Sequence, residues 1–399
     1  MNAARFDGWR MVAAVFALTL VGFGSAYTFG AFVAPLQSAF AIGRGTIGIV
    51  FGLTGFLYFG LGTVTGPLAD RIGARPLAVT GIVLIGGGLL LAATARGATA
   101  VLAGYTLGVG LGVGCLYVPV LGLVQRWFVR RRGLASGLAV SGIGVGTLAM
   151  PPLAQWLIAT WDWRLAYVVL GIVVLAIGLP AALMLRDDPA VLGQTPDGDA
   201  VQGDDVAATG LTPREAIRTR SFAFLYISMM LTGAGVFVPF VHLALDAVEQ
   251  GVGAGQAALL IALIGVGSTA GRFVLGGWAD RVGRARAFAL MGVGMGVSMA
   301  WWAVAPGFWG LATFAMMFGL FYGGWVAFAP ALVADLYGRR HVGAIIGALY
   351  SGVAIGTLAG PGIAGVLHEA TNSYFTAIGA SAIATLLGAA MLRGLKASA

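Results

Sequence analysis

The sequence predicts an all-α integral membrane protein with twelve transmembrane helices in two six-helix halves. Three observations lead to this prediction: the apolar composition, the number of long apolar runs and an internal repeat. Hydrophobic residues make up 59% of the 399 residues and charged residues only 10%, with a mean hydropathy of +0.93. Soluble domains carry about 25% charged residues, so the composition places most of this chain in a lipid bilayer.

Apolar runs long enough to cross a membrane, about 20 residues each, occur twelve times. Many contain glycine or proline, which transmembrane helices tolerate. The first run is too long for the apolar core of a signal peptide and is expected to remain as a span. The predicted spans are residues 10–36, 45–68, 76–95, 98–124, 133–159, 163–185, 221–245, 255–279, 286–305, 308–333, 341–367 and 372–392.

Basic residues predict the orientation of these spans. Of the 23 lysines and arginines, all fall on one side except Arg44, Arg96 and Arg164 on the other side and Arg272 within a span. Cytoplasmic loops carry the excess of basic residues. Both termini are therefore expected in the cytoplasm of a multi-pass protein of the plasma or inner membrane. The same loops explain the net charge of +8, so no nucleic-acid partner is predicted.

A long polar stretch divides the chain in the middle. It contains Asp187, Asp188 and Asp197 among Gly, Pro and Thr, a composition typical of a flexible linker. The predicted organisation is a six-helix half at 1–185, a cytoplasmic linker at 186–220 and a second six-helix half at 221–399.

The two halves repeat each other at an offset of 210 residues. GPLADRIGAR, beginning at Gly66, resembles GGWADRVGRA, beginning at Gly276. GIGVGTLA, beginning at Gly142, resembles GVAIGTLA, beginning at Gly352. Two separate matches at one offset indicate two halves in the same orientation, as parallel repeats in transporters are.

These motifs resemble those of a known family. The sequence GxLADRxG after the second span, with its echo after the eighth, is similar to the signature of the major facilitator superfamily. Asp7-Gly-Trp-Arg10 and the segment from Trp127 to Gly142 resemble the monocarboxylate transporter family, and Arg272 matches its span-8 arginine. The resemblance implies the major facilitator fold and transport of a lactate- or pyruvate-sized monocarboxylate with a proton.

Two departures separate the chain from the mammalian members. Those members carry a lysine deep in span 1 and an aspartate one turn before the span-8 arginine. Here the only lysine is Lys396, and the aspartate position holds Ser268, so that proton relay is not expected. The chain resembles bacterial members more closely, whose span-7 histidine and span-4 tyrosine match His242 and Tyr117.

Arg272 is the one charged residue predicted deep within a span. A cation there costs ~2.5–3.5 kcal/mol on insertion scales, and Asp280 lies about 12 Å further along the helix. A planar guanidinium binds a carboxylate through two hydrogen bonds. We therefore predict that Arg272 binds the translocated anion near the midplane; the alternative is a structural pairing with a backbone carbonyl.

Five further residues are predicted to bind substrate or a proton. His242 changes charge between pH 5 and 8, and Asp246 lies on the same helix face, so this pair is predicted to couple a proton. The alternative is an interfacial histidine bonded to Asp246. Tyr117, Tyr322, His242 and, across a bend in span 4, Cys115 are predicted to line the substrate cavity. Packing is the alternative role of the tyrosines.

The charged residues after spans 2 and 8 are predicted to gate transport. Asp70 is expected to accept hydrogen bonds from backbone N–H groups of span 11 or from arginines in one state and to lose them in the other. The alternative is a charge bias for orientation alone. The predicted gating residues are Asp70, Arg71, Arg75, Asp280 and Arg281.

No motif in the sequence predicts an enzyme. It has no Gly-x-Ser-x-Gly, Walker or metal-binding motif, so we expect no cofactor or metal, and a gradient or exchange must drive transport. We predict a proton-coupled monocarboxylate symporter that works as a monomer. Two alternatives stay open: an exchanger of anions such as formate or oxalate, and a receptor that binds its ligand without transport.

Overall fold

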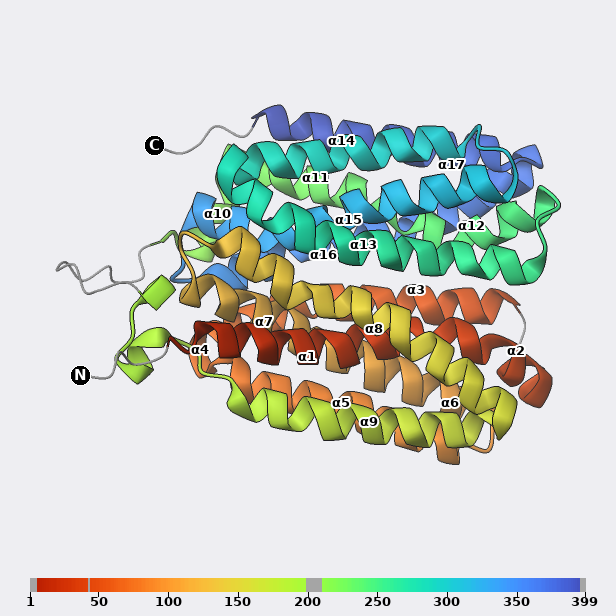
Figure 1. Ribbon diagram of the computed structural model, residues 1–399, viewed down its shortest axis with the longest axis horizontal. Coiled ribbons are helices and arrows are strands. Elements are labelled where there is room, and N and C mark those ends of the chain that lie inside the picture. Colours follow the sequence, from red (N-terminus) through yellow and green to blue (C-terminus); the bar gives the residue numbers. More distant parts are fainter. Residues whose placement is uncertain (1–5, 42–43, 199–209, 395–399) are drawn as a thin grey trace.

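The computed structural model describes residues 6–41, 44–198 and 210–394. The described residues are predominantly helical, and the helices form two bundles (Figure 1), the first red to yellow-green and the second green to blue. Residues 199–209, the central part of the predicted linker, lie outside the described residues.

Within the described residues, each bundle contains six helical rods, some of them broken into shorter helices. The first bundle contains α1 (Gly8–Tyr27) with α2 (Phe29–Phe40), α3 (Arg44–Gly60) with α4 (Gly62–Ile72), α5 (Ala74–Thr94), α6 (Ala98–Tyr105) with the π-helix η1 (Thr106–Leu111) and α7 (Gly112–Trp127), α8 (Arg132–Thr160) and α9 (Trp163–Met184). The second contains α11 (Arg220–Val236) with α12 (Val238–Glu249), α13 (Ala254–Val282), α14 (Arg284–Trp302), α15 (Gly307–Tyr337), α16 (Val342–Thr371) and α17 (Tyr374–Met391). The predicted all-α fold with two six-helix halves is confirmed.

Length and composition agree with a membrane location for these rods. Nine helices in the described chain are long and apolar enough to cross a membrane by themselves, and α13 adds a shorter apolar stretch at Leu259–Leu275. The break between α11 and α12 lies at Phe237, two residues before Pro239, which lacks the N–H needed to continue the helix. Phe237 at this break contacts Phe59 of the first half, and Phe240 just after it contacts Tyr27 of the first half.

Glycines allow α4 of the first half to approach α16 of the second half closely. A Cβ atom on Gly66 would lie 2.2 Å from the carbonyl oxygen of Gly343, and one on Gly347 would lie 1.9 Å from that of Gly62. Such distances are too short for any side chain, so only glycine fits at this crossing. A second contact between the halves joins α8 to α13.

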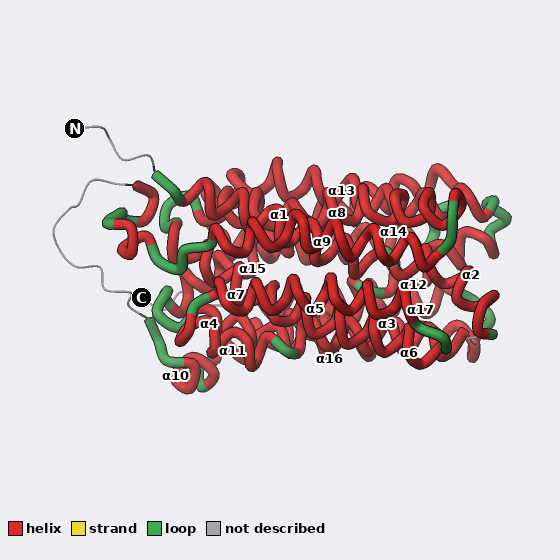
Figure 2. The backbone as a smooth tube through the Cα atoms, turned by 90° about the horizontal axis from the view of Figure 1, so that it is seen from below, coloured by secondary structure: helices red, strands yellow, loops and turns green. Residues whose placement is uncertain are grey.

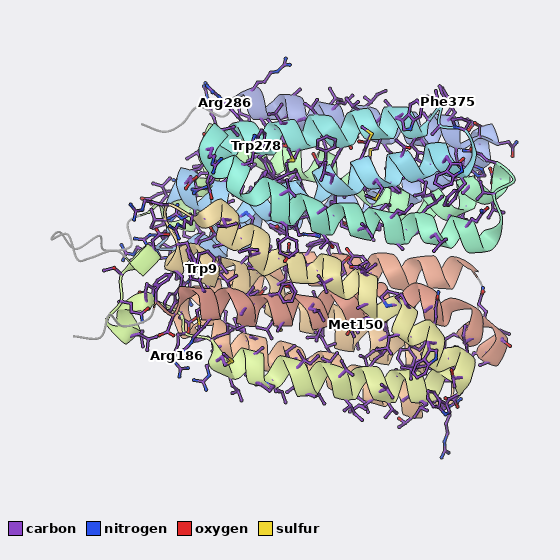
Figure 3. All side chains as sticks on the ribbon, in the orientation of Figure 1. Trp9, Met150, Arg186, Trp278, Arg286 and Phe375 are labelled. Carbon is purple, nitrogen blue, oxygen red and sulfur yellow. The ribbon has the colours of Figure 1, made fainter. Side chains whose placement is uncertain are left out.

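One end of the molecule carries both the start of α1 and the end of α17, and we call it the terminal end (Figure 1). Figure 2 shows loops gathered at the two ends of the helical bundle. Arg186 and Arg286 lie at the terminal end, whereas Phe375 lies at the opposite end on the outside of the second half (Figure 3).

The described start of the linker packs against the first half at the terminal end. It contains two 3-10 turns, η2 (Pro189–Leu192) and η3 (Pro196–Gly198). Asp197 accepts hydrogen bonds from the backbone N–H groups of Val129 and Arg130 at 2.9 and 2.8 Å. This part of the expected flexible linker is held in place because its carboxylates bind backbone donors. After the gap, Thr212 caps the short helix α10 (Pro213–Ile217).

Candidate substrate-binding site

Arg272 lies in α13 and is 1% exposed. Its Nη1 donates a hydrogen bond to the Ser268 hydroxyl, one turn earlier on the same helix. Its Nε and Nη2 have no hydrogen-bond partner among the described residues. The described structure thus shows no pairing of the guanidinium with a backbone carbonyl, and two buried donor groups remain for an anion.

Glycines on neighbouring helices make room for the guanidinium. On α15, a Cβ atom on Gly323 would lie 2.1 Å from the Ser268 carbonyl oxygen, so α15 approaches α13 beside the arginine. On α8 of the first half, a Cβ atom on Gly144 would lie 3.2 Å from Arg272 Nη1. The arginine of the second half therefore lies directly against the first half.

Two small cavities lie between the halves beside Arg272. The arginine chamber is lined by Tyr27, Ile143, Gly144, Thr147, Phe240, Ile264, Gly265, Ser268, Arg272 and Tyr322. The aromatic chamber is lined by Phe23, Phe59, Tyr117, Ile143, Phe237, Tyr322, Trp325, Val326, Tyr350 and Val353. They share two wall residues. Each measures about 10 Å³, the room of about one water molecule, so any organic ligand requires the halves to move apart here.

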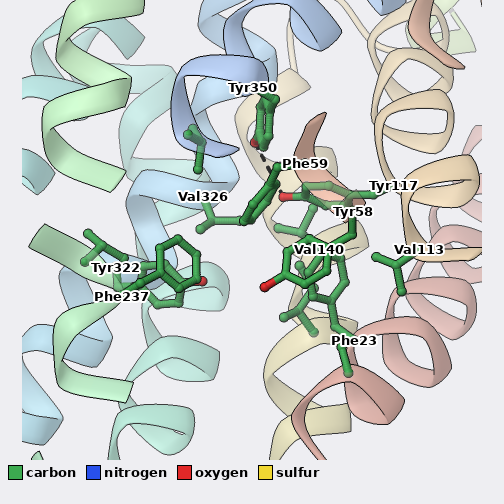
Figure 4. Close-up of a cluster of buried hydrophobic side chains, with 14 of the residues drawn as sticks. Phe23, Tyr58, Phe59, Val113, Tyr117, Val140, Phe237, Tyr322, Val326 and Tyr350 are labelled. Carbon is green, nitrogen blue, oxygen red and sulfur yellow. Dashed lines mark hydrogen bonds between the residues drawn. The ribbon is translucent and has the colours of Figure 1, made fainter. Parts of the chain in front are cut away.

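Tyrosines from both halves meet around these chambers. The hydroxyl oxygens of Tyr117 and Tyr350 lie 3.4 Å apart and form a hydrogen bond across the two halves, shown as a dashed line in Figure 4. The Tyr322 ring centroid lies 5.7 Å from Cζ of Arg272, within the range of a cation–π contact. The structure thus places two predicted binding residues, Tyr117 and Tyr322, in the walls of the chambers.

His242 and Asp246 line neither chamber. Nε2 of His242 lies 3.0 Å from the Pro361 carbonyl oxygen on α16 of the same half. Asp246 accepts hydrogen bonds from Trp302 Nε1 at 2.8 Å and from Gln250 Nε2 at 3.1 Å. Although both residues belong to α12, they bind different partners and not each other. The structure therefore separates His242 from the substrate cavity in which it was expected.

Cys115 also lies outside the two chambers. It precedes Tyr117 by two residues on α7, so the two side chains point about 160° apart around the helix. Its neighbour Gly114 faces Leu61 of the first half, and the thiol itself is half-buried. The bend of span 4 was expected near Gly114 and Pro119, but α7 runs unbroken through both, and the π-helix η1 ends before Cys115.

The halves are tied together at the terminal end by two matching contacts. Asp70 at the end of α4 accepts hydrogen bonds from the N–H groups of Gly343 and Ala344, at 3.2 and 2.8 Å, at the start of α16. The same contact recurs 210 residues later in the chain. There Asp280 at the end of α13 accepts from Gly133 and Leu134 at the start of α8, at 2.9 and 3.0 Å. Each carboxylate thus meets the positive end of a helix in the opposite half.

The family model described as Major Facilitator Superfamily matches residues 14–248 and 223–398. The chain belongs to this superfamily. Mouse monocarboxylate transporter 11 is 31% identical over 383 residues, covering 92% of this chain and 82% of that protein. Bovine monocarboxylate transporter 13 is 28% identical over 388 residues, covering 96% and 88%. Membership of the monocarboxylate transporter family, expected from the motifs, is confirmed.

Solved structures show the same fold. The human organic anion transporter MFSD10 (TETRAN) aligns with a TM-score of 0.77 and 16% identity, covering 96% of this chain and 99% of that one. The major facilitator transporter FucP, in the outward conformation, aligns with a TM-score of 0.72 and 19% identity, covering 96% and 97%. With its apolar helices, the chain is therefore a multi-pass membrane protein of a transporter superfamily.

Further charged links at the terminal end of this superfamily member involve residues that the sequence analysis missed. Arg126 on α7 pairs with Asp70 within the first half. Arg132 of the first half pairs with Asp335 of the second at 2.6 Å, and Arg284 pairs with the same carboxylate at 2.7 Å. These arginines flank the loop after span 4 and the aspartate after span 8, and that position is the signal in the sequence that indicates them.

The arginines that the sequence analysis did select make fewer contacts with charged residues. Arg71, Arg75 and Arg281 are exposed, and none of them forms an ion pair with another described residue. Among the predicted gating residues, Asp70 and Asp280 contact the opposite half in the described structure and these three arginines do not. The gating role of all five residues stays a prediction.

Proposed function

We propose that this protein carries a small monocarboxylate of lactate or pyruvate size across the membrane together with a proton, by alternating access. The observation that carries the proposal is Arg272, buried between the halves with Nε and Nη2 unpartnered. A guanidinium binds a carboxylate with two parallel hydrogen bonds, and transporter sites lie near the midplane at the repeat interface. The relatives named monocarboxylate transporters support the same substrate class.

Polar groups beside the arginine fit the second functional group of such an acid. Tyr27 lines the arginine chamber, and its buried hydroxyl, whose one recorded interaction among the described residues is a weak one with Tyr322, can turn to a ligand. Thr147 on α8 and Ser268 on α13 line the same chamber from opposite halves. A hydroxyl or keto oxygen next to the carboxylate would find donors and acceptors there.

Proton coupling follows from the charge of the substrate. A monoanion moving inward works against a negative-inside potential, at about 2.3 kcal/mol per charge per 100 mV, and one proton makes the step electroneutral. His242 is the proposed carrier, with Asp246 tuning it. Since the Pro361 carbonyl only accepts, Nε2 of His242 holds the hydrogen, and Nδ1 is buried without a described partner and available for a proton. The alternative carrier is the substrate carboxylate itself.

Orientation and assembly complete the proposal. The excess of arginines at the terminal end supports placing that end, with both termini, in the cytoplasm of the plasma or inner membrane. One chain contains both halves and the arginine between them, so a monomer is sufficient for transport. The predicted gating contacts of Asp70 and Asp280 then close the cytoplasmic side.

The proposal is tested by lactate uptake into proteoliposomes. Uptake should rise with an inward proton gradient and be indifferent to a potential set with valinomycin. Arg272→Ala should abolish saturable uptake. Arg272→Lys should also abolish it, because the ammonium group of lysine is a point charge and cannot form the two parallel hydrogen bonds of the planar guanidinium. Arg218→Lys, at an exposed arginine after α10 that is not among the predicted gating residues, is the matched control.

Three results would contradict parts of this proposal. Near-normal affinity in Arg272→Lys would exclude two-point recognition of the carboxylate. Trans-stimulation by a counter-substrate without pH dependence would indicate an anion exchanger. Binding of lactate without any flux would indicate a receptor.

A further inference from the structure

The aromatic chamber continues the arginine chamber on the other side of a shared wall. Ile143 of the first half and Tyr322 of the second line both cavities. The walls of the arginine chamber include a buried cation and polar groups, whereas those of the aromatic chamber are rings and aliphatic side chains such as Val326 and Val353. A three-carbon acid bound at Arg272 has no group that would occupy this second chamber.

Rings of opposite halves contact one another in the aromatic chamber. The centroid of Phe59, from the first half, lies 5.7 Å from those of Phe237 and of Tyr350, both from the second half. The centroids of Tyr117 and Tyr350 are 5.5 Å apart with their planes at 77°. All four rings are at most 5% exposed, and Figure 4 shows them converging from the two halves.

These contacts must break when the halves separate to admit a ligand. Each aromatic side chain buries about 150–250 Å², and parting the halves exposes part of that surface to water. The hydroxyls of Tyr117 and Tyr350 bond to each other, so an apolar group is the better match for the ring faces and edges around them. A planar ring placed between the halves would restore contacts at the separations of about 4.5–7 Å that aromatic pairs prefer.

We propose that the aromatic chamber is a second subsite that takes an aryl tail, so that the transporter binds aryl-substituted monocarboxylates more tightly than lactate or pyruvate. The carboxylate lies on Arg272, and the tail passes Tyr322 into the space among Phe59, Phe237 and Tyr350. This inference rests on the proposed function and extends the substrate class of the same site.

Matched ligand pairs test the subsite on the purified full-length protein. Phenylpyruvate is pyruvate with a phenyl group on its methyl carbon, and phenyllactate is related to lactate in the same way. In competition against labelled pyruvate, each phenyl form should bind at least about tenfold more tightly, a difference of ~1.4 kcal/mol. Arg272→Ala should abolish the binding of all four acids.

Two variants change the chamber in opposite ways. Phe59→Leu removes the ring that contacts both Phe237 and Tyr350, and Val326→Phe fills the chamber from its wall. In both variants the preference for the phenyl form should fall toward unity, even if either variant reduces the amount of folded protein. Phe375→Leu removes a ring that is 60% exposed and should keep the wild-type preference.

The outcomes separate this inference from the proposed function. If pyruvate binds through Arg272 but phenylpyruvate binds equally or more weakly, the aryl subsite is refuted and monocarboxylate transport stands. If phenylpyruvate binds tightly and both chamber variants keep the preference, the tail lies elsewhere and the inference is also refuted. If none of the four acids binds, the proposed function fails and the subsite fails with it.

Discussion

Replacing Asp70 with asparagine should weaken closure of the terminal end. Its side chain accepts the N–H groups of Gly343 and Ala344 across the two halves. Asparagine keeps one acceptor oxygen and loses the negative charge, so the variant loses about one charge-assisted hydrogen bond between the halves. Such a bond contributes ~1.5–3 kcal/mol, and 1.4 kcal/mol is tenfold in an equilibrium constant. The ratio of closed to open terminal ends should therefore fall roughly tenfold or more.

The repeat supplies a second, independent perturbation. Asp280→Asn alters the equivalent contact with Gly133 and Leu134 and should shift the same equilibrium in the same direction. Spin labels at Pro76, in the first turn of α5, and at Arg286, in the first turn of α14, report the opening, since both are exposed residues of opposite halves. Distances are measured by double electron–electron resonance in a Cys115→Ala background, where no other thiol remains.

Substrate binding and a control variant show whether a change in these distances reflects opening of the terminal end. Substrate binding should stay roughly intact in Asp70→Asn while exchange slows, because the change biases one state and not the site. Arg218→Gln, at an exposed arginine after α10 that is not among the predicted gating residues, should leave the distances unchanged. A wild-type distance distribution in Asp70→Asn would refute the reasoning, and an equal loss of binding and flux would indicate misfolding or a role in the site.

Two further predictions concern the linker and the proton. Asp197→Ala removes the acceptor of the Val129 and Arg130 N–H groups and should lower stability by ~1 kcal/mol, the usual effect of losing a cap; an unchanged thermal unfolding midpoint would contradict this. His242→Ala removes the unpartnered Nδ1 and should weaken the rise of lactate uptake as the external pH falls. If that variant keeps the wild-type pH profile, His242 is structural and the proton travels with the substrate.

The fold was predictable because the sequence features that indicate it, apolar runs and a repeat, occur along the whole chain. The apolar runs predict the helices, and the repeat at 210 residues predicts two parallel halves. It also relates Asp70 to Asp280, and their contacts in the structure match residue by residue. The break at Phe237 was not predicted, since apolar content is the same on both sides of it and transmembrane helices tolerate a proline such as Pro239.

Only part of the candidate site was predictable, namely Arg272 and the two tyrosines Tyr117 and Tyr322 that line the chambers. Arg272 stands out because a cation in a span is expensive. His242 and Cys115 do not line the chambers, which the sequence could not indicate because the face that a helix turns toward the other half depends on packing. The position of Arg132 beside the loop after span 4 is visible in the sequence, but its pairing with Asp335 is not, because an ion pair between residues so distant in sequence leaves no local pattern. The aromatic chamber was missed as a unit, since rings at helical spacing are also typical of ordinary packing.

The repeat that relates the two terminal-end contacts breaks down at the site. Position 62, which corresponds to Arg272, is glycine, and even a Cβ atom there would lie 2.6 Å from Val118 and 3.4 Å from the backbone of Gly347. An arginine therefore has no room in the first half, where α4 must approach α16. Three tyrosines of the site also lack polar equivalents: Tyr322 corresponds to Gly112, Tyr117 to Ala327 and Tyr350 to Val140. The matching contacts at the terminal end fit a motion in which both halves move symmetrically. The site itself is not symmetric, because it contains one guanidinium, which binds one carboxylate. Each transport cycle should therefore carry a single monoanion.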